Sequence, residues 1–120
     1  EQRASEKGTA FGLGQVYLAP QDTAQSYAPI FDKIMIKAAI ERPVRVVDQN
    51  DQPVWGVEMR AVKNGEQLLI NIVNLSNNEQ IVKLKTSRPI YKAKDLISGQ
   101  LLAETITLAP LSPMLVLVNF

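Results

Sequence analysis

Carboxylates are the side chains of this sequence whose chemistry could be catalytic. The 120 residues include no histidine and no cysteine, which excludes Ser-His-Asp and Cys-His mechanisms and any thiolate nucleophile or sulfur-ligated metal. Acid–base hydrolysis of a glycosidic bond needs two carboxyl groups that flank the bond. Glu58 and Glu104 lie inside segments of regular pattern, and Glu58 stands two residues before Arg60. A surface ion pair explains Glu58, so we predict no catalytic pair within this chain.

Two short motifs resemble ion or phosphate sites but depart from the patterns that such sites need. The acidic stretch at residues 48–51, DQND, lacks the glycine that a calcium loop carries at its sixth position, where Pro53 stands. It predicts a polar hairpin turn instead. The stretch GLG at residues 12–14 is too short for a phosphate loop and precedes a predicted strand, not a helix. We therefore expect no metal site and no cofactor.

The aromatic residues could bind sugar rings, but their pattern favours other roles. Trp55 shares one face of a predicted strand with three apolar residues, Val57, Met59 and Ala61. This alternation predicts core packing for Trp55. Tyr17, Tyr27 and Tyr91 are isolated in sequence and would form a sugar platform only if the fold brought them together. No carbohydrate-binding residue is assigned from the sequence.

Polar residues at strand positions have structural explanations. Residues 74–76, Asn-Leu-Ser, match the N-glycosylation triplet, but they lie at a predicted strand end, where a turn needs polar residues. Two lysine pairs alternate with apolar residues and predict solvated strand faces that also protect a sheet edge; these are Lys83 with Lys85, and Lys92 with Lys94.

Before Pro43 the sequence predicts one strand and one helix. Residues 14–20 form a short predicted strand. A helix from Ala28 to Ile40 follows, since apolar residues recur three and four positions apart; they are Phe31, Ile34, Met35 and Ala38. Ser26 is the expected N-cap, which places Pro29 in the first turn. The apolar surface of this helix is wide and is expected to pack on two sides.

After Pro43 the hydrophobic period becomes two. Short predicted strands alternate with turn signals; they cover residues 44–48, 54–62, 67–74, 80–85, 90–96, 104–110 and 114–120. Asn64-Gly65 is a strong hairpin signal. Seven or eight short strands with such brief connections predict an antiparallel β-sandwich of mainly β class. The strand at residues 67–74 is expected to be central scaffold, with Leu68, Ile70 and Ile72 on one face.

We therefore predict a strand–helix appendage over residues 1–42 and a β-sandwich domain over residues 43–120. The predicted strand at 14–20 has no partner nearby. Either it joins an edge of the sandwich, or it completed a sheet of a preceding domain, which is the origin we favour. Thirteen basic and twelve acidic residues leave a net charge of +1, which does not favour nucleic acid or a membrane as partner.

Targeting and compartment stay open at this stage. The chain has no run of eighteen apolar residues, so no membrane span is expected. Its first ten residues are polar and unlike a signal peptide; a leader could have been removed, or the chain could be a piece of a longer one. An extracytoplasmic or periplasmic location is preferred to a cytoplasmic one.

Four segments together resemble the C-terminal region of bacterial glycoside hydrolases of the β-galactosidase type, family forty-two. They are GLGQVYLAP (12–20), ERPVRVVDQNDQPVWGVEMRAVKNGEQLLINIVNLSNN (41–78), KAKDLISGQ (92–100) and ITLAPLSPMLVLVNF (106–120). The resemblance implies the end of an α/β domain used in trimerisation, followed by a terminal β-sandwich. The catalytic glutamates of that family lie on its barrel, and none of them maps onto this sequence.

Three functions remain open from the sequence. The first is a noncatalytic accessory domain of a carbohydrate-active enzyme, which packs against other domains of a parent glycosidase. The second is a carbohydrate-binding module. The third is self-association, with a homo-oligomer formed through the helix from Ala28 to Ile40.

Overall fold

The computed structural model describes residues 9–11, 13–16 and 24–120. The chain divides into two compact units, Glu1–Ala38 and Ala39–Phe120, and each is described here by itself. The domain boundary expected between residues 42 and 43 stays a prediction.

The first unit contains a small hairpin that the sequence did not reveal. Strand β1, Thr9–Phe11, pairs antiparallel with strand β2, Gly14–Val16. The prediction that the strand at 14–20 has no partner nearby was therefore wrong. Residues 17–20 of that predicted strand lie outside the described residues. Three residues are too few to show a two-residue period, which is why β1 escaped detection.

The helix of the first unit, α1, covers Ala24–Lys37. Ser26 therefore lies inside the helix, so its prediction as N-cap was wrong, and Pro29 lies beyond the first turn, where it removes one helical hydrogen bond. The apolar period marks the interior of a helix and does not locate its first residue. The helix also ends before the predicted Ile40, because Ala39 adopts a left-handed conformation (φ 52°) that stops helical geometry.

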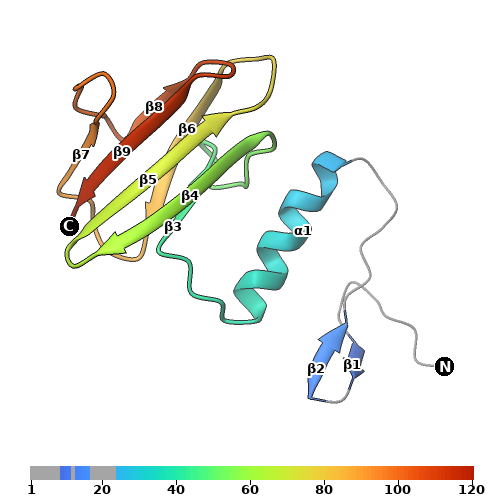
Figure 1. Ribbon diagram of the computed structural model, residues 1–120. Coiled ribbons are helices and arrows are strands. Elements are labelled where there is room, and N and C mark those ends of the chain that lie inside the picture. Colours follow the sequence, from blue (N-terminus) through green and yellow to red (C-terminus); the bar gives the residue numbers. More distant parts are fainter. Residues whose placement is uncertain (1–8, 12, 17–23) are drawn as a thin grey trace. The chain divides into compact units, whose positions relative to one another are not determined.

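The second unit is an antiparallel β-sandwich of seven strands, as predicted. One sheet has the order β3-β6-β8 and the other β4-β5-β9-β7, and Figure 1 shows the two sheets as separate layers. The strands are β3 (Val44–Val47), β4 (Val57–Asn64), β5 (Gln67–Asn74), β6 (Gln80–Thr86), β7 (Lys92–Asp95), β8 (Thr105–Leu108) and β9 (Pro113–Asn119).

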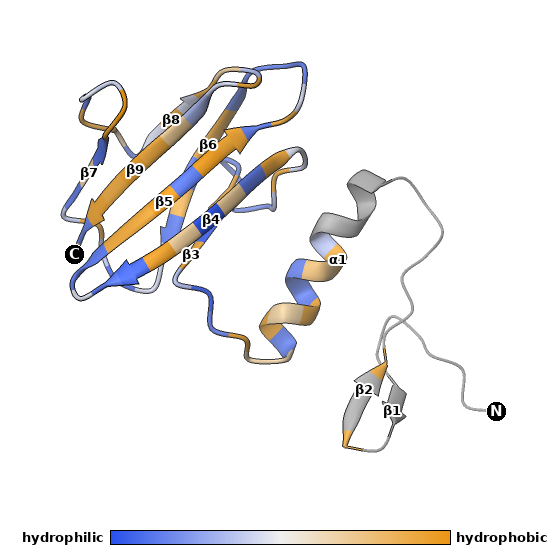
Figure 2. Cartoon of the chain, viewed as in Figure 1, coloured by the Kyte–Doolittle hydropathy of each residue, from blue (hydrophilic) through white to orange (hydrophobic). Residues whose placement is uncertain are grey.

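The core lies between the two sheets. Strand β5 was predicted to bury alternate residues, and Leu68, Ile70 and Ile72 are indeed fully buried, whereas Leu69 and Asn71 are exposed. Strand β9 of the same sheet and the strands of the opposite sheet contribute the remaining core residues, which are Val116 and Val118 from β9 and Val44, Val82, Ile106 and Leu108 from β3, β6 and β8. Figure 2 shows the apolar character of β5 and β9, the two middle strands of the four-stranded sheet. The 67–74 strand is thus central scaffold.

The predicted hairpin between β4 and β5 is present. Asn64 pairs with Gln67, so the two-residue turn consists of Gly65 and Glu66. Gly65 has φ 58° and Glu66 has a negative φ. Glycine with positive φ at the first turn position is typical of a type II′ turn. Asn64 therefore closes the strand and does not form the turn itself.

Trp55 does not lie in the core, so the prediction for it was wrong. Trp55 is 47% exposed and precedes β4, which begins at Val57. Gly56 adopts φ 81°, a conformation that interrupts the alternation of faces along an extended chain. The alternation holds only from Val57 onward, where Val57, Met59 and Ala61 pack against the core as expected.

No helix in the described part of the chain is both long and apolar enough to cross a membrane.

Candidate functional site

A groove of about 770 Å³ lies in the sandwich unit, between two segments that are distant in sequence. Residues 84–93 form one wall, and residues 101–104 with Ile106 form the other. We call this feature the edge groove. A second hollow, of about 460 Å³, lies on the outer face of β4, β5 and β9.

Backbone hydrogen bonds hold the two walls of the edge groove together. The N–H of Leu102 donates to the oxygen of Ala93 (2.9 Å), and Lys94 forms an isolated antiparallel bridge with Leu101. At the start of β7, the N–H of Tyr91 donates to the oxygen of Asn119 (2.9 Å). The backbone of the groove is therefore part of the sandwich framework, although its residues belong mostly to connections.

The side chains of the edge groove include an exposed aromatic ring and charges of both signs. Tyr91 is 86% exposed and Leu101 is 65% exposed. Within the described residues, Lys92 and Glu104 make no ion pair, and both line the groove. Such a mixture of apolar surface and hydrogen-bonding groups is typical of ligand sites.

The other two cations of the groove are already paired. Lys85 contacts the carboxylate of Asp51, and Arg88 contacts that of Glu66 while lying 5.2 Å from the centre of the Phe120 ring. Hydrogen bonds from Lys85 and then Lys83 lower the pKa of Asp51, and Arg88 lowers the pKa of Glu66 in the same way. Each of these two cations thus has an acidic partner within the protein, and Lys85 shares its partner with Lys83.

The structure does not bring the two candidate glutamates together as a catalytic pair. Glu58 is exposed on the outer side of β4 and contacts Arg60 at 3.1 Å, which confirms the predicted ion pair. Glu104 lies in a bend before β8, in the other sheet, and so outside regular structure. Among the described residues, no cluster of three or more His, Cys, Asp or Glu side chains is suited to a metal ion.

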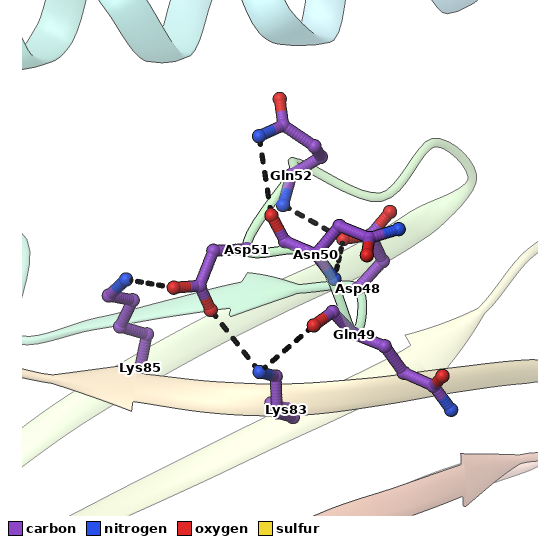
Figure 3. Close-up of polar contacts among 7 residues, drawn as sticks. All are labelled: Asp48, Gln49, Asn50, Asp51, Gln52, Lys83 and Lys85. Atoms are coloured by element: carbon purple, nitrogen blue, oxygen red, sulfur yellow. Dashed lines mark hydrogen bonds and ion pairs between the residues drawn. The ribbon is translucent and has the colours of Figure 1, made fainter.

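The acidic stretch at 48–51 forms the hairpin turn that the sequence predicted. One carboxylate oxygen of Asp48 accepts hydrogen bonds from the N–H groups of Asn50 (2.8 Å) and Gln52 (2.9 Å). Figure 3 shows that the turn is also held by two lysines of β6, since Lys83 contacts both Asp51 (3.3 Å) and the oxygen of Gln49. The lysine pair predicted as a solvated face therefore also stabilises this turn.

Asn74 of the glycosylation triplet is buried and fully hydrogen-bonded. Its side-chain N–H₂ donates to the backbone oxygens of Asn78 (2.7 Å) and Leu108 (3.0 Å). Its side-chain oxygen accepts from the N–H of Ser76 (2.9 Å) and from the Ser76 hydroxyl (2.6 Å). With 0% exposure, this side chain is inaccessible in the folded unit and serves as the polar cap of a turn.

Asp95, the first residue of the DLISG stretch, has a similar structural role. It is 5% exposed, and its carboxylate accepts from the N–H groups of Ile97 (3.1 Å), Ser98 (3.0 Å) and Leu115 (3.2 Å). Burial alone would raise the pKa of Asp95, but the hydrogen bond from the Ser98 hydroxyl and those from the backbone outweigh it and lower the pKa. Gly99, with φ 78°, closes the turn by donating to the oxygen of Asp95.

The remaining sequence candidates lie wholly or partly outside the described residues, except Tyr91. Tyr17 and Gly12 lie outside the described residues, and Tyr27 lies in α1 with its side chain outside the described part. Sequence reasoning treated Tyr91 as isolated and did not connect it with Lys92, Leu101 and Glu104. Only the pairing of the two groove walls brings these residues together, and no local pattern signals it.

Comparisons with known proteins identify the fold. No protein-family model matches this sequence, and no curated protein matches it. Among solved structures, the apo exo-carrageenase GH42 from Bacteroides ovatus has a TM-score of 0.65 and 20% identity over 91% of this chain. Gan42B, a GH42 β-galactosidase from G. stearothermophilus, has a TM-score of 0.60 and 22% identity over 94%. In each case this chain spans 15% of the other chain's length, and at such identity the likeness shows the fold alone.

Proposed function

We propose that this chain is a noncatalytic accessory domain of a larger bacterial glycoside hydrolase, and that it packs against other domains of that enzyme. The likeness to two GH42 enzymes, of which this chain would make up only a small part, carries the proposal. The fold alone does not determine a function, so the residue chemistry has to support the assignment.

The side chains support a noncatalytic role. Neither histidine nor cysteine occurs in the sequence, and the buried carboxylate of Asp95 is held by hydrogen bonds within its own turn. Glu58 is engaged by Arg60 and lies on a different sheet from the segment that contains Glu104. Acid–base hydrolysis of a glycoside needs two carboxyl groups within about 5–10 Å on either side of the bond. Of the two hollows described above, the edge groove is lined by a single carboxylate, Glu104, and the other hollow by none.

The outer face of the four-stranded sheet supports domain packing. Val62 is paired with Leu69, and Leu69 with Leu117, so three apolar residues form a row across β4, β5 and β9. Val62 is 65% exposed and Leu69 is 37% exposed, and this row lines the hollow of about 460 Å³. The outward face of a solvated antiparallel sheet is usually polar. We call these three residues the apolar row.

Covering the apolar row would stabilise an interface between domains. The exposed parts of Val62 and Leu69 amount to roughly 150 Å², which corresponds to about 4 kcal/mol at 25 cal/mol per Å² before entropy costs. Within one polypeptide the loss of translational freedom on docking is small because a linker keeps the domains close. A modest apolar row is therefore sufficient for packing between linked domains.

The noncatalytic part of the proposal is tested with the 120-residue chain and chromogenic galactosides. We expect no turnover above the buffer rate at neutral pH. Turnover that is lost in Glu58→Gln or Glu104→Gln, with unchanged circular dichroism, would contradict the proposal because it would assign the chemistry to these carboxylates.

The packing part is tested in the gene and in the protein it encodes. We expect the reading frame upstream of the Glu1 codon to continue into a catalytic domain with two strand-end glutamates. In that longer protein, amides near Val62 and Leu69 should exchange hydrogen more slowly than in the 120-residue chain. A Val62→Thr/Leu69→Thr double variant should remove this difference, whereas Ile81→Thr, an exposed change in the other sheet, should not. Equal exchange in both proteins would refute packing on this face.

Self-association is a second candidate, favoured by the apolar surface of α1. Phe31 and Ile36 of this helix are each 59% exposed. Sedimentation equilibrium of the 120-residue chain should then show a dimer or higher state that an Ile36→Glu variant disrupts. A monomer at all protein concentrations up to about 100 μM would exclude this candidate, since such weak association would bring less than about 5 kcal/mol.

A further inference from the structure

We propose that the edge groove binds a neutral sugar ring, which stacks on Tyr91 and is hydrogen-bonded by Lys92 and Glu104. This site is independent of the packing face, because the apolar row lines a different hollow. The inference goes beyond an accessory packing role and assigns ligand binding to residues that the sequence left unconnected.

The apolar part of the groove suits the carbon–hydrogen face of a pyranose ring. Tyr91 is 86% exposed, so its ring contributes little to the core and is available for stacking. The backbone of Tyr91 is nevertheless fixed, since its N–H donates to the oxygen of Asn119. Leu101, 65% exposed, adds apolar surface on the opposite wall. An exposed aromatic ring on a fixed backbone offers contact area at a low entropic cost.

The polar part of the groove suits hydroxyl groups. Lys92 offers N–H donors and Glu104 offers carboxylate acceptors, and neither makes an ion pair within the described residues. A hydroxyl can accept from the ammonium and donate to the carboxylate, and hydrogen bonds to charged groups are stronger than neutral ones. The hydroxyls of a bound ring can therefore be donors to Glu104 and acceptors from Lys92.

The balance of charge favours a neutral ligand over an anionic one. The groove's paired cations, Lys85 and Arg88, contact the carboxylates of Asp51 and Glu66. The remaining charges, Lys92 and Glu104, are opposite in sign. Because Lys83 shares Asp51 with Lys85, these groups together carry one net positive charge. One charge is a weak field for attracting a polyanion, and the binding of a neutral ring does not depend on it.

The size of the groove suits a short segment of a glycan. Its volume of about 770 Å³ lies within the range of about 300–1,000 Å³ that is usual for small-molecule sites. The groove is open on one side, as the exposure of Tyr91 and Leu101 shows, so the chain of a longer saccharide can leave it freely. An open site of this kind predicts weak binding, with a Kd on the order of 1 mM.

The test is a titration of the 120-residue chain with neutral β-1,4-galactotetraose, followed by ¹H–¹⁵N NMR. We expect saturable shifts of amides in residues 84–93 and 101–106 and unchanged affinity between about 50 and 500 mM NaCl, since a neutral ligand is not subject to salt screening. Tyr91→Ala should weaken binding at least about fivefold, in line with the stacking contribution of an aromatic ring. Lys92→Met and Glu104→Gln should each weaken it as well.

Trp55→Ala serves as the matched control, because Trp55 is an exposed aromatic residue outside the groove. It should leave the affinity unchanged. The proposal is overturned if neither galactotetraose nor cellotetraose causes shifts at 20 mM, about twenty times the expected Kd. Shifts that map around Trp55 would also overturn it. So would binding of tetragalacturonate alone with a strong dependence on salt. Failure of this test leaves the packing proposal intact, since that proposal concerns the apolar row.

Discussion

Replacing Asn74 by alanine removes a buried side chain that makes four hydrogen bonds. Asn74 is 0% exposed, and its amide makes four hydrogen bonds at 2.6–3.0 Å. These bonds join the end of β5 to the following turn and to the end of β8, in the opposite sheet. The amide therefore links the two layers at a point where apolar contacts are replaced by polar ones.

The expected loss follows from which partners water can reach. The oxygen of Leu108 is buried, so leaving it unpaired costs about 1–3 kcal/mol. The partner groups of Ser76 and Asn78 lie nearer the surface, where water replaces the lost bonds at about 0.5–1 kcal/mol each. We expect Asn74→Ala to lower the free energy of unfolding by about 3 kcal/mol. A domain of roughly 80 residues has a total of about 4–12 kcal/mol, so the variant retains a smaller but measurable stability.

Urea unfolding followed by circular dichroism measures this loss. With a slope of about 1–1.5 kcal/mol per M for a domain of this size, the midpoint should fall by about 2–3 M. The control is Asn78→Ala, which keeps the backbone oxygen that accepts from Asn74 and should change stability by less than about 0.5 kcal/mol. A loss below about 1 kcal/mol for Asn74→Ala, or one equal to that of the control, would show that the amide is not the link described here.

Three further predictions concern the turns. The pKa of Asp95 is held below 3.8 in the folded state. The ionised carboxylate therefore stabilises the fold fully above pH 3.8, and this stabilisation is lost as the pH falls further. The urea midpoint of Asp95→Asn should thus change less between about pH 5 and pH 2 than that of the wild type. Gly56→Ala should cost about 1–3 kcal/mol in urea unfolding, because Gly56 has φ 81° and an added Cβ would lie 3.2 Å from the Cβ of Ser76. Gly65→Ala is its control and should cost less, since no atom lies within 4 Å of the added Cβ. Asp51→Asn should lower the thermal midpoint slightly at low salt and not at 0.5 M NaCl (a Debye length of about 4 Å), because the side chain that both lysines share is 50% exposed. An equal loss at both salt concentrations would contradict this account.

The β-sandwich was predictable because its signals are local. The two-residue period of β5 places Leu68, Ile70 and Ile72 on one face whatever the strand pairs with. The turn at residues 48–52 was also predictable, since Asp48 bonds to N–H groups two and four residues further on. Both features need only a few neighbouring residues.

The sequence-based predictions were wrong where a single backbone conformation, or the pairing of a very short strand, interrupted the hydrophobic period. Trp55 was assigned to the core by its alternation with Val57, but the positive φ of Gly56 separates the two. The first strand was missed because three residues show no period, and its pairing with Gly14–Val16 determines it. The start of α1 before Ser26 shows in addition that apolar spacing does not locate a helix end.

The sequence by itself determined that residues 43–120 form short antiparallel strands, because hydrophobic period and turn residues act locally. It also determined that no histidine- or cysteine-dependent chemistry occurs in this chain, because that follows from its composition. Only the tertiary structure decided which strands share a sheet, that Asn74 and Asp95 cap buried turns, and that Tyr91, Leu101 and Glu104 line one groove. Each of these features includes a contact between residues that are ten or more positions apart, such as the bonds from Asn74 to Leu108 and from Leu115 to Asp95. Their energies come from long-range register and burial, which a local pattern does not encode.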